Sequence, residues 1–208
     1  MDTSKLWRAA LWAALITIFY NIFEGIVSVI FGYSDETLSL FGFGLDSFVE
    51  VISGLGVFHM IIRINKNKDK RDLFEKIALR ITGFSFYLLM AGLIITAILN
   101  IINKSHPSTT FWGIVISIIS ILTMSFLMKF KMNIGKKLNS NSIIADANCT
   151  KTCIYLSIIL LISSILYEIF KIGYIDSIGA LGIAFYAFKE GKEAFEKAKR
   201  PDFDCCCK

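Results

Sequence analysis

Six long apolar segments constrain this chain more than any other feature of its sequence. They cover residues 6–31, 38–64, 77–102, 111–132, 143–170 and 174–188. A helix needs about 20 apolar residues to cross the hydrocarbon core of a bilayer, and most of the segments are long enough. Hydrophobic residues make up 55% of the 208 residues, which leaves too little polar surface for a soluble domain. We therefore expect an all-α membrane protein, a bundle of six transmembrane helices.

Basic residues are concentrated in every second connection between these segments. Lysine and arginine are frequent over residues 66–71, 129–137 and 189–200, whereas the opposite loops hold only Lys104 and Lys171. By the positive-inside rule, we expect both termini in the cytoplasm. Lys5 and Arg8 precede the first apolar run, which has no small-residue cleavage site, so we expect an uncleaved first helix. The sequence predicts a multi-pass protein of the bacterial inner membrane.

Residues 1–200 are expected to form one domain, with a short cytoplasmic helical extension after residue 188. Glu193 and Lys197 stand four residues apart, a favourable spacing for an ion pair on a helix. Pro201 should end that helix, leaving residues 201–208 as a flexible tail. This tail either captures a soft metal ion or serves lipidation or redox chemistry through its three cysteines, Cys205, Cys206 and Cys207.

Two carboxylates lie inside the second apolar segment. Asp46 and Glu50 are four residues apart and therefore share one helical face. Burying one carboxylate in a membrane costs several kcal/mol, and a second one beside it adds repulsion. A bound cation would relieve both costs. Cys149 and Cys153 repeat the same spacing in the fifth segment.

The second and fifth segments cross the membrane in opposite directions, which predicts how the two pairs meet. Asp46 should lie level with Cys153, and Glu50 level with Cys149. Four donors can then converge as a tetrahedron, the geometry that Zn²⁺ accepts, and thiolates favour softer ions over Mg²⁺ and Ca²⁺. A lone membrane cysteine is usually a small hydrophobic residue, but the matched spacing favours a transition-metal site.

Four more acidic residues lie in or beside the apolar segments and are candidates for secondary metal or proton positions. They are Glu24, Asp146, Glu168 and Asp176. Asp146 and Glu168 share a polar stripe of the fifth segment with the two cysteines. Structural contacts at helix ends are an equally good interpretation of Glu24, Glu168 and Asp176.

The motifs around these residues resemble those of the cation diffusion facilitator family. The family's second-helix pattern has two ligand positions separated by three residues, and Asp46 and Glu50 match it. The preceding stretch, residues 38–42, matches the family pattern as well. The fifth-segment pattern matches residues 145–147, followed by ligand positions at Cys149 and Cys153. Asp176 and the small residues 179–182 match the start of the family's sixth helix. The resemblance covers almost the whole chain and implies six membrane helices, cytoplasmic termini and proton-coupled efflux of a divalent metal.

Three departures from the family pattern affect what the resemblance implies. Cys149 and Cys153 stand where the family usually has histidine or aspartate, which bears on the choice of metal. We expect no counterpart of the cytoplasmic metal-binding domain or of the histidine-rich loop that many zinc transporters have. The resemblance is therefore to short, membrane-domain-only members, and a homodimer would form through the membrane helices.

These observations predict a secondary transporter that exports Zn²⁺, or Cd²⁺ or a similar thiophilic ion, in exchange for protons. Thiols must lose protons to bind metal, so metal and protons compete for one site. The expected partners are the metal, protons, lipid and a second copy of the chain; neither enzymatic activity, a catalytic cofactor nor nucleic acid is expected. Two alternatives stay open: a membrane protein that binds or senses metal without transport, and a membrane thiol oxidoreductase.

Overall fold

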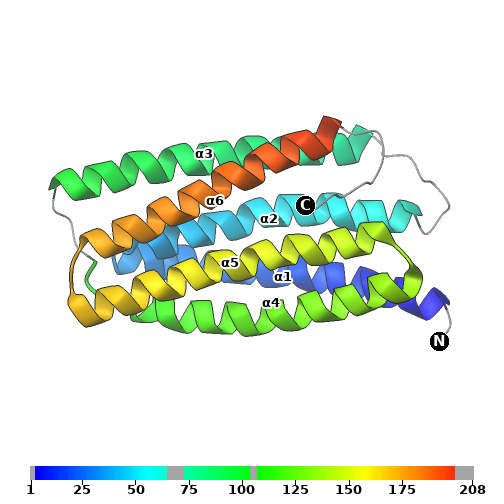
Figure 1. Cartoon of the computed structure of the whole chain (residues 1–208), viewed down its shortest axis with the longest axis horizontal. Helices are drawn as coiled ribbons and strands as arrows, with labels where there is room; N and C mark the ends of the chain where they lie inside the picture. The colour runs from blue at the N-terminus through cyan, green and yellow to red at the C-terminus, as the bar shows by residue number, and fades with distance from the viewer. Residues whose placement is uncertain (1–2, 65–72, 104–106, 200–208) are drawn as a thin grey trace.

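The computed structural model describes residues 3–64, 73–103 and 107–199, which form six long helices. The helices are α1 (Thr3–Ser34), α2 (Leu38–Ile64), α3 (Leu73–Asn103), α4 (Phe111–Leu138), α5 (Asn141–Phe170) and α6 (Tyr174–Lys199). They lie side by side as one elongated bundle (Figure 1). The predicted all-α architecture is confirmed, and the bounds of α2 agree with those of the apolar segment.

The bundle carries apolar side chains outside and polar ones inside, as α1 illustrates. Phe19 and Phe23 on its outer face are 68% and 69% exposed, whereas Asn21 and Glu24 on the inner face are only 2% and 4% exposed. In water this distribution would be unfavourable, but in lipid the polar residues have to face the bundle interior. The chain is therefore an integral multi-pass membrane protein.

Five of the described helices, α1 to α5, are long and apolar enough to cross a membrane by length and composition. The apolar part of α6, residues 174–188, is shorter and continues into a charged segment, so the sixth membrane crossing stays a prediction. The helical extension is confirmed up to Lys199, and Lys197 Nζ lies 2.7 Å from Glu193 Oε1. Pro201 and the tail cysteines lie outside the described residues.

Both ends of the described chain lie at the same end of the bundle, together with the connection between α4 and α5 (Figure 1). This arrangement agrees with both termini on one side of the membrane, and their cytoplasmic location stays a prediction. The basic residues expected after the fourth segment are instead part of α4, which continues to Leu138. Lys131 among them is buried, with 1% of its surface exposed.

α2 occupies a central position, in contact with α1, α3, α5 and α6. Its approach to α1 depends on glycine. A Cβ atom on Gly32 would lie 2.5 Å from the backbone nitrogen of Phe41, and one on Gly44 would lie 2.8 Å from the nitrogen of Val29. Such small residues let two membrane helices approach closely, and they bring the polar face of α1 against the carboxylates of α2.

Candidate metal site

Glu50 is the residue at which three helices meet. Asn21 of α1 donates a hydrogen bond from Nδ2 to Glu50 Oε2, at 3.0 Å. On the other side, Cys153 Sγ of α5 lies 2.8 Å from Glu50 Oε1 and 2.7 Å from Oε2. Cys153 is buried, with 4% of its surface exposed. The structure therefore joins a predicted carboxylate and a predicted thiol from different helices.

The register between α2 and α5 differs from the expected one. The sequence predicted Cys153 level with Asp46, but the structure places it at Glu50. The difference is one helical turn, or about 6 Å at 1.5 Å per residue. The predicted level of Cys153 beside Asp46 is therefore not what the structure shows, and the pairing of Glu50 with Cys149 stays a prediction. The side chain of Cys149 lies outside the described part of the structure.

Contacts with α4 explain the register of α5. Ser157 Oγ lies 2.9 Å from Ser120 Oγ, and Lys131 Nζ lies 3.0 Å from Asp146 Oδ1. α4 and α5 are joined by a short connection and pack extensively. Their polar pairs therefore fix α5 along its axis, independently of the candidate ligands on α2.

Asp46 lies one turn before Glu50 on α2 and is 2% exposed. Its Oδ1 is buried and has no hydrogen-bond donor among the residues that the structure describes. At the neighbouring position, Ser47 Oγ lies 3.2 Å from Glu24 Oε2, and Tyr20 donates a hydrogen bond to Glu24 Oε1 at 3.0 Å. Glu24 is thus brought to the α1–α2 contact beside the site. This buried concentration of carboxyl groups would be stabilised by a cation.

Asp146 takes part in a different interaction. It accepts the hydrogen bond of the Lys131 ammonium, which also lies 3.1 Å from Thr150 Oγ1. The pair is almost completely removed from solvent, with 2% and 9% of the two side chains exposed. Asp146 therefore links α5 to α4, and the structure does not bring it to Glu50.

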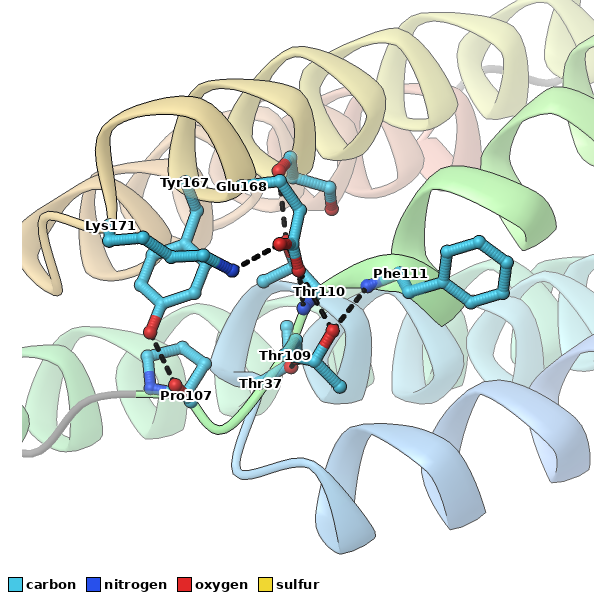
Figure 2. A network of polar contacts seen from close by, with 9 residues as sticks. Thr37, Pro107, Thr109, Thr110, Phe111, Tyr167, Glu168 and Lys171 are labelled. Carbon is cyan, nitrogen blue, oxygen red and sulfur yellow. Dashed lines mark hydrogen bonds and ion pairs between the residues drawn. The ribbon is translucent and has the colours of Figure 1, made fainter.

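The end of α5 lies at the end of the bundle opposite the termini (Figure 1). There Glu168 holds the start of α4 (Figure 2). It accepts hydrogen bonds from the backbone N–H of Thr110 at 2.7 Å and from Thr109 Oγ1 at 2.8 Å. Lys171 pairs with the same carboxylate, and the neighbouring Tyr167 hydroxyl donates to the carbonyl of Pro107. These contacts agree with the interpretation of Glu168 as a residue that makes structural contacts at a helix end.

Asp176, at the start of α6, binds the first turn of α2. Its carboxylate accepts the backbone N–H groups of Leu38 at 2.7 Å and Ser39 at 3.2 Å, together with the Ser39 hydroxyl. The first N–H groups of a helix have no partner within it, so Asp176 caps α2 from a distant part of the chain. This is again a helix-end contact.

Sequence reasoning did not assign two residues that the structure places near the candidate ligands. Asn21 stands three residues before Glu24 and lies with it on the buried inner face of α1. Glu190 of α6 accepts a hydrogen bond from Thr152 Oγ1 at 3.2 Å, next to Cys153, and burial together with Glu193 raises the pKa of Glu190. Its spacing of fourteen residues from Asp176 places both on one face of α6, a signal that could have identified it.

The expected convergence of four donors stays a prediction. Among the described residues, no three or more histidine, cysteine, aspartate or glutamate side chains gather closely enough to hold a metal ion. Two of the four predicted ligands, Glu50 and Cys153, are in direct contact, and Asp46 lies one turn away on α2. The tail cysteines Cys205, Cys206 and Cys207 lie outside the described residues.

Comparison with known proteins identifies the family. Residues 10–200 match the family model of the cation efflux transmembrane domain. The chain is 28% identical over 185 residues to an uncharacterized transporter of Methanocaldococcus jannaschii, an alignment that covers 84% of this chain and 63% of the relative. It is 27% identical over 202 residues to the manganese efflux system protein MneP of Bacillus subtilis, with 92% and 66% covered.

The chain spans about two thirds of the length of these curated relatives. The family model covers most of the chain, and it describes a transporter domain rather than an enzyme, as the sequence predicted. The chain belongs to the cation efflux transmembrane domain family, the family that its sequence motifs resemble.

Proposed function

We propose that this protein exports a divalent transition-metal ion from the cytoplasm, with Asp46, Glu50, Cys149 and Cys153 as its ligands. The observation that carries the proposal is the contact between Glu50 and Cys153, at 2.7 and 2.8 Å, inside a bundle with an apolar exterior. Ionisable residues within a membrane are costly and mark ion pathways. A thiol against a carboxylate across two helices supplies two donor types of a transition-metal site.

The donor set favours Zn²⁺ as the cargo, with Cd²⁺ as a close second. Thiolate sulfur binds these ions better than it binds hard ions such as Mn²⁺. The relative from Bacillus subtilis is named as a manganese efflux protein, so Mn²⁺ has to be compared directly. Cys149 and Cys153 are the residues on which we base the preference for thiophilic ions.

The same residues support exchange of metal against protons. A thiol must lose its proton to bind metal, and a carboxylate released by the metal can take one up. Cys153 Sγ lies 2.8 Å from Glu50 Oε1, as donor and acceptor of a hydrogen bond. Metal and protons therefore compete for these atoms, which is the minimum that an antiporter requires.

The main alternative is a membrane protein that binds the metal without transporting it. Flux separates the two functions: purified protein in sealed liposomes, with a metal-sensitive dye inside, should carry Zn²⁺ across when a proton gradient is applied. Asp46→Asn should reduce the flux of every metal because it removes a charged ligand. Cys149→Ala/Cys153→Ala should reduce Cd²⁺ and Zn²⁺ flux more than Mn²⁺ flux.

Glu196→Gln is a matched control, because it removes the charge of an exposed carboxylate at the end of α6. It should transport at the wild-type rate. Tight metal binding without flux would support the binding-only alternative. Absence of both binding and flux for Zn²⁺, Cd²⁺ and Mn²⁺ would contradict the proposal altogether.

Two further expectations belong to this proposal. The tail cysteines Cys205, Cys206 and Cys207 would capture metal on the cytoplasmic side, so their removal should weaken transport at low metal and spare it at saturation. The transporter would work as a homodimer formed through its membrane helices. Cross-linking in membranes, compared with purified protein, tests the second point.

A further inference from the structure

Asn21 is the third residue in direct contact at the candidate site. Its side-chain nitrogen holds Glu50 Oε2 at 3.0 Å, while Cys153 approaches the same carboxylate from α5. Asn21 is 2% exposed and belongs to α1. The contact set therefore contains an amide, a carboxylate and a thiol, one from each of three helices.

The oxygen of the Asn21 amide is buried and has no hydrogen-bond donor in the part of the chain that the structure describes. The Asn21 amide has to face Glu50 with Nδ2, because the opposite orientation would place Oδ1 against the Glu50 carboxylate and the two acceptors would repel each other. The neighbouring donors Tyr20 and Ser47 both bond to Glu24. Buried polar atoms in folded proteins nearly always have a partner, so we expect Asn21 Oδ1 to bind one in the functional protein.

Asp46 Oδ1 is in the same condition, buried and without a donor among the described residues. It lies one turn from Glu50 on α2, and Glu50 is the residue that Asn21 contacts. Two such acceptor oxygens beside a carboxylate and a thiol form an arrangement that a cation satisfies, because buried charged groups in proteins are paired or coordinate metals.

We propose that Asn21 supplies its amide oxygen as an additional ligand to the transported ion, so that α1 shares in the metal site. The inference rests on the proposed function and adds a donor type to it. Asn21 Nδ2 fixes Glu50 Oε2. Glu50 Oε1, which Cys153 also contacts, and Asn21 Oδ1 are then the oxygen ligands offered by adjacent helices. An amide oxygen is a hard, neutral ligand that binds no proton in the physiological range. It therefore holds the ion whatever the protonation state of the thiols and carboxylates.

A mixed donor set has a consequence for selectivity. Carbonyl and carboxylate oxygens suit Mn²⁺, whereas thiolates suit softer ions. Asn21 should contribute more to the affinity for Mn²⁺ than to that for Cd²⁺, since sulfur supplies much of the Cd²⁺ affinity. If Asn21 only positions Glu50, every metal that uses Glu50 should lose affinity to the same extent.

Binding of Mn²⁺ and of Cd²⁺ to the purified full-length protein, measured by titration calorimetry, distinguishes the two roles. Asn21→Leu keeps the size of the side chain but removes both its oxygen and its N–H donor. It should weaken Mn²⁺ binding about 10-fold or more, as the loss of contacts around a metal site typically does, and Cd²⁺ binding by less than about 3-fold. Asn21→Asp keeps an oxygen ligand and should retain Mn²⁺ binding. If the leucine variant does not fold, Asn21→Ser tests the same prediction. It should show the same selective loss of Mn²⁺ affinity.

Ser28→Ala is the matched control, because Ser28 is also fully buried on the inner face of α1 and its hydroxyl has no hydrogen-bond partner among the described residues. It should leave both affinities unchanged. Equal losses for Mn²⁺ and Cd²⁺ in Asn21→Leu, or no loss for either, would overturn the assignment. So would an Asn21→Asp variant that loses Mn²⁺ as fully as the leucine variant.

These failures differ from failure of the proposed function. A wild-type protein that binds neither metal would remove both proposals. A wild-type protein whose binding depends on Glu50 and Cys153, with Asn21 variants unchanged, would remove only the role of Asn21.

Discussion

Replacing Lys131 by methionine tests the buried ion pair that joins α4 to α5. The Lys131 ammonium lies 3.0 Å from Asp146 Oδ1, and 2% and 9% of the two side chains are exposed. Methionine keeps the length of the side chain but leaves the carboxylate buried without its cation. Removing one partner of a buried ion pair typically costs about 3–5 kcal/mol. We expect Lys131→Met to lower the free energy of unfolding by that amount, and Asp146→Leu to do the same.

The double variant Lys131→Met/Asp146→Leu should recover most of the loss, because apolar pairs often replace buried ion pairs without net cost. A surface pair of the same chemistry provides the control. Lys197 Nζ lies 2.7 Å from Glu193 Oε1, but the two side chains are 17% and 33% exposed. Solvent-accessible pairs at this helical spacing contribute about 0.3–0.5 kcal/mol, so Glu193→Gln should cost far less than Lys131→Met.

Reversible unfolding in mixed detergent micelles, followed by far-ultraviolet circular dichroism, gives these free energies. The reasoning would be refuted if Lys131→Met cost less than about 1 kcal/mol, well below the range for a broken buried pair. It would also be refuted if the losses of the two single variants simply added in the double variant, since residues in contact should be coupled.

Three further predictions address packing, capping and topology. Gly32→Ala should destabilise the bundle by about 1–3 kcal/mol, because its Cβ would meet the Phe41 backbone. Gly92→Ala should not, because its Cβ would meet no other described residue beyond its own helical neighbours within 4 Å. Equal melting temperatures of the two variants would contradict this. Asp176→Ala should cost about 0.5–2 kcal/mol through loss of the α2 cap, measured by the same unfolding assay, and an unchanged value would mean that the cap is dispensable. In a cysteine-free variant, a cysteine at Ser108 should react with an impermeant reagent from outside the cell and one at Asn139 should not, because positive residues remain inside; the reverse pattern would invert the topology.

The positions of the helices could be predicted because hydropathy is a local property of the sequence. The bounds of α2 were correct, and α1 and α5 begin and end within a few residues of the apolar segments. α4 was predicted too short. Its last turns carry Lys136 and Lys137 and are helical although no longer apolar. Hydropathy locates the part of a helix that contacts lipid, and the helix itself can continue beyond it.

The candidate ligands within one helix could be predicted, but their alignment across helices could not. Asp46 and Glu50 follow from a spacing of four residues. The contact of Cys153 with Glu50, one turn from the expected level of Asp46, depends on where α4 holds α5. The position of α5 along its axis results from polar contacts with α4 that lie away from the carboxylates of α2. The opposite directions of α2 and α5 do not by themselves determine that position.

Lys131 was interpreted as a marker of topology because a lysine near the end of an apolar segment usually serves that role. Its burial becomes apparent only when Asp146 is placed opposite. The short connection between α4 and α5 offers a signal for this: residues at similar distances before and after such a connection face one another. Lys131 and Asp146 satisfy that condition, as do Ser120 and Ser157.

We propose that the transported ion binds between α2 and α5 with sulfur among its ligands. X-ray absorption at the zinc edge, on purified protein loaded with one equivalent of Zn²⁺, tests it most directly. We predict a zinc–sulfur distance of about 2.3 Å, with a sulfur contribution that decreases in Cys153→Ser and persists in Glu196→Gln. A wild-type spectrum with bound zinc and only oxygen or nitrogen ligands, at about 2.0–2.2 Å, would contradict the claim.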